Sequence, residues 1–130
     1  MVARRYQDLI AFQLADEFKR EIIRLVQRPQ AALDLRYRSQ LVNAATSVAA
    51  NIVEGFLRHS PGQFAHYLAI AIGSLGEAEV RLRDGILLKH FTEADCALAL
   101  PFAKRCATAT VRLKVSQEEY ARSKRKKGRR

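Results

Sequence analysis

Tryptophan is absent from the sequence, cysteine occurs twice, proline three times, and no long run is purely apolar. Cys96 and Cys106 are ten residues apart on one expected helix. They would therefore lie about 15 Å apart, too far for a disulfide, and we expect buried thiols in a reducing compartment. The first residues form no secretory signal, and no apolar run is long enough to span a bilayer. These absences predict a cytoplasmic protein with no membrane contact.

Motifs of common catalytic and cofactor sites are also absent from the sequence. No Glu is followed by a His three residues later, the pair that di-iron helical bundles use. The three histidines share no metal-ligand spacing, and neither a phosphate-cradling glycine loop nor a nucleophile signature occurs. We therefore predict no metal, no cofactor and no catalytic residue, that is, a non-enzymatic protein.

Acidic residues are the scarcer charged class. Thirteen Asp and Glu stand against 23 Lys and Arg, which gives a formal net charge of +10. Residues 121–130 hold seven of these basic residues and no acid. Such a run favours acidic partners, so we predict a disordered tail over 121–130 that binds phosphates of RNA or DNA, with a purely solubilising tail as the alternative. Its basic residues are Arg122, Lys124, Arg125, Lys126, Lys127, Arg129 and Arg130.

Helical spacing of apolar residues recurs along the whole chain and predicts an all-α fold. The few breakers divide the chain into four expected helices, at about Asp8–Arg28, Asp34–Leu57, Pro61–Leu88 and Thr92–Arg122. Short connections between long helices predict an antiparallel, up-down-up-down four-helix bundle over residues 1–120. Pro101 lies inside the last expected helix and predicts a kink there.

Two of the expected helices have more apolar surface than one bundle can cover. From Leu41 to Leu57 the second helix is apolar or small nearly all round, and the third has a second apolar side at Ile70 and Gly73. A helix that is apolar all round is buried all round. This pattern predicts a subunit interface and hence a homo-oligomer.

Two polar stripes run along these otherwise apolar helices. Their members recur at spacings of three and four, which places each stripe on one side of its helix. The members are Ser47, Asn51, Glu54 and Arg58 in the second helix, and Ser74, Glu77 and Arg81 in the third. Because the two helices are expected to run antiparallel, the stripes are expected to face each other.

A carboxylate buried in such a stripe needs a charged or hydrogen-bonding partner. We interpret the stripes as a structural polar network that fixes helix register or subunit contacts. The alternative is a ligand or catalytic pocket with Glu54 as a base and Arg58 as an anion binder. Gly55, which weakens the helix, is expected to let another helix approach closely.

The central stripe also carries a family resemblance. "SVAANIVEGFLR", Ser47–Arg58, resembles the S-[IV]-x-x-N-I-x-E-G-x-x-R signature of the helical proteins encoded in bacterial 23S rRNA intervening sequences. The segments "YQDLIAFQLA", "SQLVNAATS" and "QFAHYLAIAIGSLGEAE" resemble further parts of that family, so that the resemblance covers about Tyr6 to Leu88. Two departures are Ala49, where members often have Pro, and Asn43, where many have a basic residue.

The resemblance implies a closed four-helix bundle that assembles into a ring, expected to be a homopentamer. The family is similar to the accessory protein of diversity-generating retroelements, a basic ring that engages a reverse transcriptase and nucleic acid. This similarity implies RNA, DNA or a nucleic-acid-processing protein as partner. It supplies no catalytic residues, and it implies that the stripe residues hold helices or subunits together.

The resulting hypothesis is a non-enzymatic, oligomeric helical protein that binds nucleic acid through its basic residues. One alternative is a scaffold that docks a protein and binds no nucleic acid. The other is a ribonuclease that uses Arg83 and His90, because "RDGILLKH" fits the loose Arg-x(4–6)-His pattern of HEPN-type ribonucleases.

Overall fold

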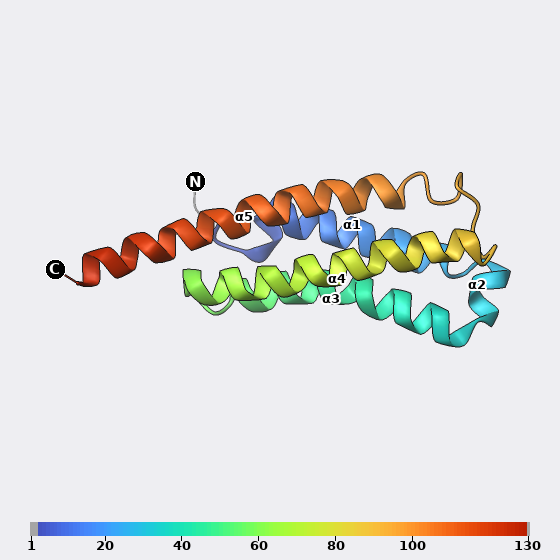
Figure 1. Cartoon of the computed structure of the whole chain (residues 1–130), viewed down its shortest axis with the longest axis horizontal. Coiled ribbons are helices and arrows are strands. Elements are labelled where there is room, and N and C mark those ends of the chain that lie inside the picture. Colours follow the sequence, from blue (N-terminus) through green and yellow to red (C-terminus); the bar gives the residue numbers. More distant parts are fainter. Residues whose placement is uncertain (1–2, 130) are drawn as a thin grey trace.

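The computed structural model describes residues 3–129 and shows an all-α protein, as the sequence predicts (Figure 1). Over that range there is no strand. No helix there combines the length and the hydropathy that crossing a bilayer requires. A 3-10 turn, η1 (Tyr6–Asp8), precedes the helices α1 (Ile10–Leu25), α2 (Pro29–Leu33), α3 (Leu35–Phe56), α4 (Pro61–Leu87) and α5 (Ala99–Gly128).

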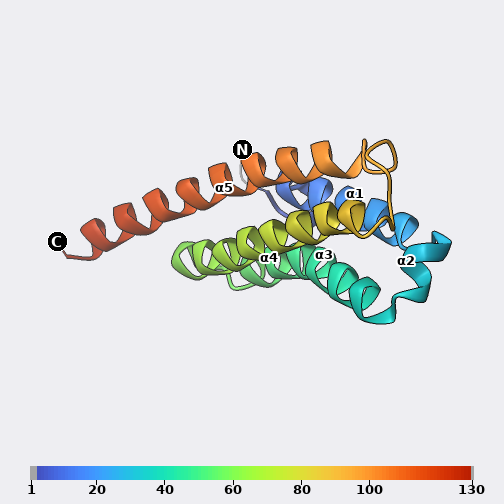
Figure 2. The same ribbon diagram turned by 45° about the vertical axis from the view of Figure 1, so that its right-hand side comes forward.

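The four long helices, α1, α3, α4 and α5, pack around one core. α3 packs against α1 and α4, and α5 also packs against α1 and α4. Consecutive long helices alternate in direction (Figures 1 and 2). The start of α1, the end of α3, the start of α4 and the end of α5 therefore lie at the same end of the molecule, and α2 lies at the other.

The core is formed by apolar side chains that recur every three or four residues on the inner face of each long helix. Burial of one such large side chain contributes about 1.5–3 kcal/mol. The largest fully buried residues include Phe18, Ile22 and Leu25 of α1, Leu41, Val48 and Ile52 of α3, Leu68 and Leu82 of α4, and Cys106 and Thr110 of α5.

Local capping sets the starts of the middle helices. The Asp34 side chain accepts a hydrogen bond from the backbone N–H of Tyr37 at 3.2 Å, and Ser60 Oγ accepts one from Gln63 at 3.4 Å. These side chains replace partners that the first N–H groups of a helix lack. Pro61 follows at the first helical position, where its missing N–H costs nothing.

The predicted end of the first helix is wrong. The first helix ends at Leu25 rather than Arg28, and Pro29 begins the separate short helix α2. Proline has no N–H for the preceding turn and pushes the residue before it out of the helical conformation. Arg28 accordingly has an extended backbone, with φ −62° and ψ 141°.

The start of the last helix is also corrected. Thr92 does not cap α5. Its side-chain oxygen accepts from the N–H of Asp95 at 3.1 Å, and the Asp95 carboxylate accepts from the N–H of Thr92 at 2.9 Å, which closes an isolated turn. The helix begins at Ala99 instead. Pro101 therefore lies in the first turn of α5, where no preceding helical turn exists for its pyrrolidine ring to clash with. The basis for the predicted kink is thus removed.

The predicted disordered tail is corrected as well. Residues 121–128 continue α5, which projects past the other helices (Figures 1 and 2), and Arg130 lies outside the described residues. Ala, Lys and Arg are strong helix formers, and an existing helix extends without a new nucleation step. Cations in the last turn, here Arg125, Lys126 and Lys127, also interact favourably with the helix dipole.

Candidate nucleic-acid interface

The two polar stripes meet at the contact between α3 and α4. Ser47 Oγ of α3 and Ser74 Oγ of α4 are 2.9 Å apart. Asn51 Nδ2 donates to the backbone oxygen of Ser47 at 2.8 Å and to its hydroxyl at 2.9 Å. All three side chains are part-buried. Their hydrogen bonds fix the register of α3 against α4.

Further along α3, the stripe reaches the surface. Glu54 and Arg58 form an ion pair of 2.6 Å, with 50% and 44% of their side chains exposed. Arg58 also donates to Tyr67 Oη at 2.9 Å and stacks over that ring at 5.2 Å. The hydrogen bonds that Arg58 donates to Glu54 raise the pKa of Arg58. The premise of a buried carboxylate is therefore wrong here, because long side chains at a helix edge extend into solvent.

The stripe of α4 continues in the same way. Glu77 Oε1 accepts from Arg81 Nε at 3.1 Å, and the Glu77 side chain is 53% exposed. Arg81 Nη1 donates to Gln40 Oε1 of α3 at 3.0 Å. Tyr37 Oη of α3 donates to the backbone oxygen of Arg81 at 2.5 Å. These bonds join α3 and α4 near their other ends.

Gly55 lies at a close approach of α3 to α4. A Cβ atom at this position would lie 2.8 Å from Tyr67 Cβ, 2.9 Å from Phe64 Cδ1 and 3.2 Å from the Phe64 backbone oxygen. Real Cβ atoms essentially never make contacts under 3.0 Å. The expectation that this glycine admits a neighbouring helix therefore holds, and that helix is α4 of the same chain.

Arg83 and His90 have different surroundings. Arg83 pairs with Glu79 at 3.3 Å and is 61% exposed. His90 is 12% exposed, its Nε2 lies 2.9 Å from Asp34 Oδ2, and its ring centroid lies 4.9 Å from that of Tyr37. The hydrogen bond from His90 lowers the pKa of Asp34 below its ordinary 3.8. His90 thus ties the segment after α4 to the start of α3, and the structure shows no contact that joins it to Arg83.

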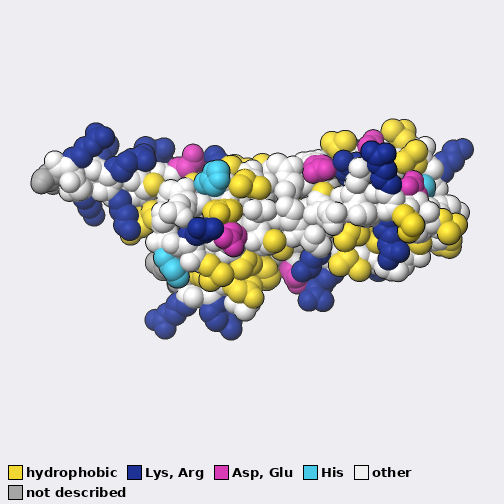
Figure 3. All heavy atoms as spheres, turned by 90° about the horizontal axis from the view of Figure 1, so that it is seen from below, with side chains coloured by type: hydrophobic (Ala, Val, Ile, Leu, Met, Phe, Trp, Pro, Cys, Tyr) yellow, Lys and Arg dark blue, Asp and Glu magenta, His cyan; other side chains and the backbone are white. Residues whose placement is uncertain are grey.

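The projecting part of α5 carries a concentration of unneutralised charge. Arg122 and the basic residues from Lys124 to Arg129 are exposed, and within the described range none of them forms an ion pair. Figure 3 shows dark-blue Lys and Arg side chains gathered at this end of the molecule. Lys124 Nζ lies over the Tyr120 ring at 5.2 Å. Six cations on a helix that few other residues cover form a strongly positive surface.

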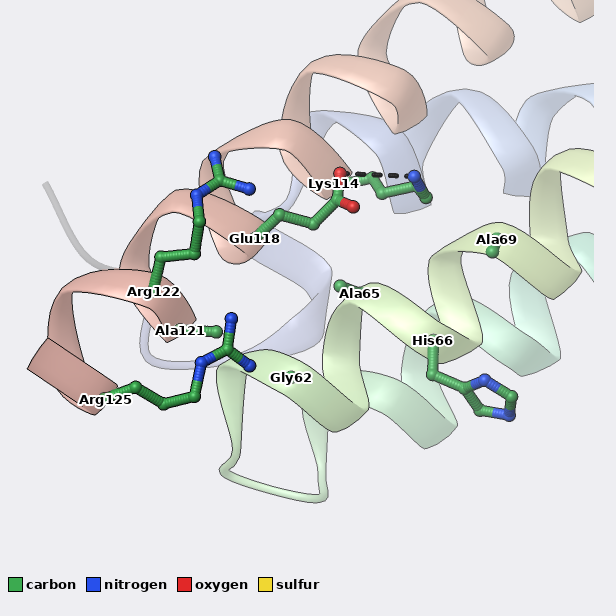
Figure 4. A pocket seen from close by; sticks show the side chains of 9 residues that line it. All are labelled: Gly62, Ala65, His66, Ala69, Lys114, Glu118, Ala121, Arg122 and Arg125. Carbon is green, nitrogen blue, oxygen red and sulfur yellow. Dashed lines mark hydrogen bonds and ion pairs between the residues drawn. The ribbon is translucent and has the colours of Figure 1, made fainter.

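A groove runs between this part of α5 and the start of α4. Its volume is about 330 Å³. Figure 4 shows the residues that line it. Small residues of α4 and α5 form its walls, and Lys114 and Glu118, which pair with each other at 3.2 Å, lie along it. Arg122 and Arg125 complete the lining without an acidic partner. This groove was not predicted from the sequence, although the helical spacing of Glu118, Arg122 and Arg125 places them on one side of a helix.

A second groove, of about 500 Å³, lies between α1 and α3. It is lined by the apolar residues Ile23, Val26, Leu35 and Val42 together with Gln27, Arg38, Ser39 and Asn43. Leu35 is 72% exposed, which is unusual for a large apolar side chain beside a concave surface. Asn43, one of the departures from the family pattern, therefore lies on this groove and not at the basic end.

Neither stripe nor groove assembles a metal site, since residues 3–129 contain no group of three or more His, Cys, Asp and Glu side chains placed to hold an ion. In comparisons with known proteins, a family model described as 23S rRNA-intervening sequence protein matches residues 7–109. No curated protein matches the chain.

Proposed function

The chain belongs to the 23S rRNA-intervening sequence protein family, and from this premise we propose that it is a non-enzymatic protein that binds nucleic acid through its basic end. The basic end consists of residues 121–129 of α5 and the groove between α4 and α5. The observation that carries the proposal is the run of six exposed cations without an acidic partner on a projecting helix.

Phosphate groups are the ligand that this surface suits best. Arg and Lys side chains that replace the counterions of a nucleic acid gain affinity by releasing those ions. The cations lie on all sides of the α5 extension. Residues 121–129 contain no aromatic ring, and the ring of Tyr120, just before them, is 54% exposed. Base stacking therefore contributes little, and we expect binding that depends on the backbone rather than on the base sequence.

We further propose that the four long helices form an up-down-up-down four-helix bundle whose copies assemble into a ring, a homopentamer. The exposed side of α4 supports this proposal, because Ile70 and Val80 are 41% and 60% exposed and a Cβ at Gly73 or Gly76 would meet no atom within 4 Å. A flat, partly apolar helix face admits another helix. A ring would present several basic ends at once and strengthen binding through multivalency.

One comparison of variants tests the nucleic-acid proposal. Lys126→Gln/Lys127→Gln removes two charges from the basic end, and Lys104→Gln/Arg105→Gln removes two exposed charges from the first half of the same helix. We expect the first pair to weaken binding of a labelled single-stranded RNA clearly more than the second. Equal effects of the two pairs would show that net charge, and not this end of α5, determines binding.

A protein-docking scaffold is the second candidate, and the apolar groove between α1 and α3 favours it. The partner would then be a protein, for example one that processes nucleic acid. This candidate requires that a partner captured by the full chain stays bound by a chain that ends at Tyr120, and that Leu35→Asp releases it. Loss of the partner on truncation would instead favour binding through the basic end.

A further inference from the structure

The groove at the basic end combines an arginine pair on α5 with the open start of α4. Two arginines, Arg122 and Arg125, are spaced by three on α5, line the same concave surface, and form no ion pair within residues 3–129. The one carboxylate on that surface, Glu118, is neutralised by Lys114 at 3.2 Å. The groove therefore carries the net charge of its two arginines. Planar guanidinium groups bind phosphate oxygens through paired N–H donors, which ammonium groups do not provide.

The opposite wall of the groove gives a phosphate close access to the backbone. Gly62 lies in the first turn of α4, and a Cβ atom at this position would meet nothing within 4 Å. Ala65 and Ala69 extend this wall along α4 with small side chains, and His66 also lines it. Pro61 has no N–H and the N–H of Gln63 bonds to Ser60 Oγ, so Gly62 carries the one N–H of this turn that has no acceptor within residues 3–129. In Figure 4 the guanidinium of Arg125 points toward this turn.

We propose that the groove between the start of α4 and the projecting part of α5 binds a phosphate group of the nucleic-acid backbone, held between the arginine pair Arg122 and Arg125 and the first turn of α4. This inference rests on the proposed function and makes it more specific. The basic end then positions the backbone at one defined site, and the remaining cations of α5 add an unspecific attraction. The groove volume of about 330 Å³ accommodates a phosphate with part of its sugar.

The helix provides a matched control for the arginine pair. Lys124 and Lys127 have the same spacing on α5 but lie on the side away from the groove, which neither of them lines. Arg122→Gln/Arg125→Gln and Lys124→Gln/Lys127→Gln change the net charge equally. We expect the first pair to weaken binding of a labelled single-stranded RNA at least about tenfold more than the second, the effect of losing one or two charged hydrogen bonds.

A second pair of variants tests the groove without any change of charge. Gly62→Leu fills the groove from the α4 side, whereas Gly62→Ala adds only a Cβ, which would meet no atom within 4 Å, and leaves the groove open. We expect Gly62→Leu to weaken RNA binding about tenfold, the loss of one charged hydrogen bond, and Gly62→Ala to leave it within about twofold. Far-UV circular dichroism verifies that each variant keeps its helices.

Three ligands separate the possible sources of phosphate: the labelled RNA, inorganic phosphate, and vesicles of phosphatidylserine and phosphatidylcholine. The backbone amide resonance of Gly62 reports on the groove in each case. RNA that binds and shifts this resonance, with the expected order of variants, supports the inference. RNA binding with equal losses for the two pairs on α5 overturns the groove site and leaves the proposed function standing. If inorganic phosphate or vesicles shift the Gly62 resonance but RNA does not bind, the proposed function is overturned instead.

Discussion

Replacing Gly55 by alanine is the sharpest test of how α3 and α4 are held. In an exposed helix interior, Gly→Ala stabilises by up to about 1 kcal/mol because alanine is the better helix former. At Gly55 the new methyl group would lie 2.8 Å from Tyr67 Cβ and 2.9 Å from Phe64 Cδ1. The Phe64 backbone oxygen, at 3.2 Å, leaves no room for the chain to shift toward α4.

Overpacking of this kind costs about 1–3 kcal/mol. The gain in helix propensity offsets part of this cost. We therefore expect Gly55→Ala to lower the free energy of unfolding by about 1–2 kcal/mol. The matched control is Gly76→Ala in α4, where a Cβ meets nothing within 4 Å. We expect that substitution to raise the free energy of unfolding by about 0.5–1 kcal/mol.

Urea unfolding, monitored by far-UV circular dichroism, measures both changes at one protein concentration. The mass of the protein in solution is determined for each variant to compare oligomeric states. The structure predicts opposite signs for the same chemical change at the two positions. Equal stabilisation by Gly55→Ala and Gly76→Ala would refute the close approach of α4 to α3 at Gly55.

Three further predictions follow from the contacts described above. A double-mutant cycle of Ser47→Ala and Ser74→Ala should give a coupling energy of about 0.5–1.5 kcal/mol in urea unfolding, the usual worth of one hydrogen bond; additive effects would contradict the contact between α3 and α4. Because the hydrogen bond from His90 lowers the pKa of Asp34, the ionised carboxylate stabilises the fold above pH 3.8 and loses this effect as the pH falls through the lowered pKa. The stability difference between wild type and Asp34→Asn should therefore shrink in acid, and a constant difference would argue against the interaction. Burial raises the pKa of both cysteine thiols to about 11, so a thiol reagent at neutral pH should modify neither in the folded protein and both in denaturant; fast labelling of the folded chain would contradict their burial.

Helix limits were predictable where a side chain caps the helix, and less so where two local signals compete. Ser60 with Pro61 and Asp34 before α3 act within their own few residues, so the sequence shows them directly. Thr92 and Asp95 make the same kind of capping pair, but they close a turn that no helix follows until Ala99. Only the packing of the later residues distinguishes the two cases.

The basic C-terminal segment shows a different limit of sequence reasoning. Charge alone predicts repulsion and disorder. The helix nevertheless continues through Gly128, because it extends from a segment anchored by the buried residues Ala103, Cys106 and Thr110. Anchoring depends on contacts with α1 and α4, which the charge pattern does not contain.

The candidate sites were predictable only in part for the same reason. Spacing on one helix places Ser47 and Asn51 on one side, and the antiparallel arrangement brings Ser74 opposite them. Spacing does not show how deep a stripe lies, so the surface position of Glu54 was missed. The groove at the basic end joins residues of α4 and α5 that are about 60 positions apart in the sequence, and only the fold brings them together.

The most direct test of the account measures RNA and duplex DNA binding across a salt series, for the full chain and for a chain that ends at Tyr120. Each phosphate contact contributes about 0.7–0.9 to the slope of log affinity against log salt concentration. We predict a steep slope for the full chain, with most of the affinity and of the slope lost in the shorter one. No binding by the full chain at low salt, or an unchanged slope after truncation, would contradict binding through the basic end of α5.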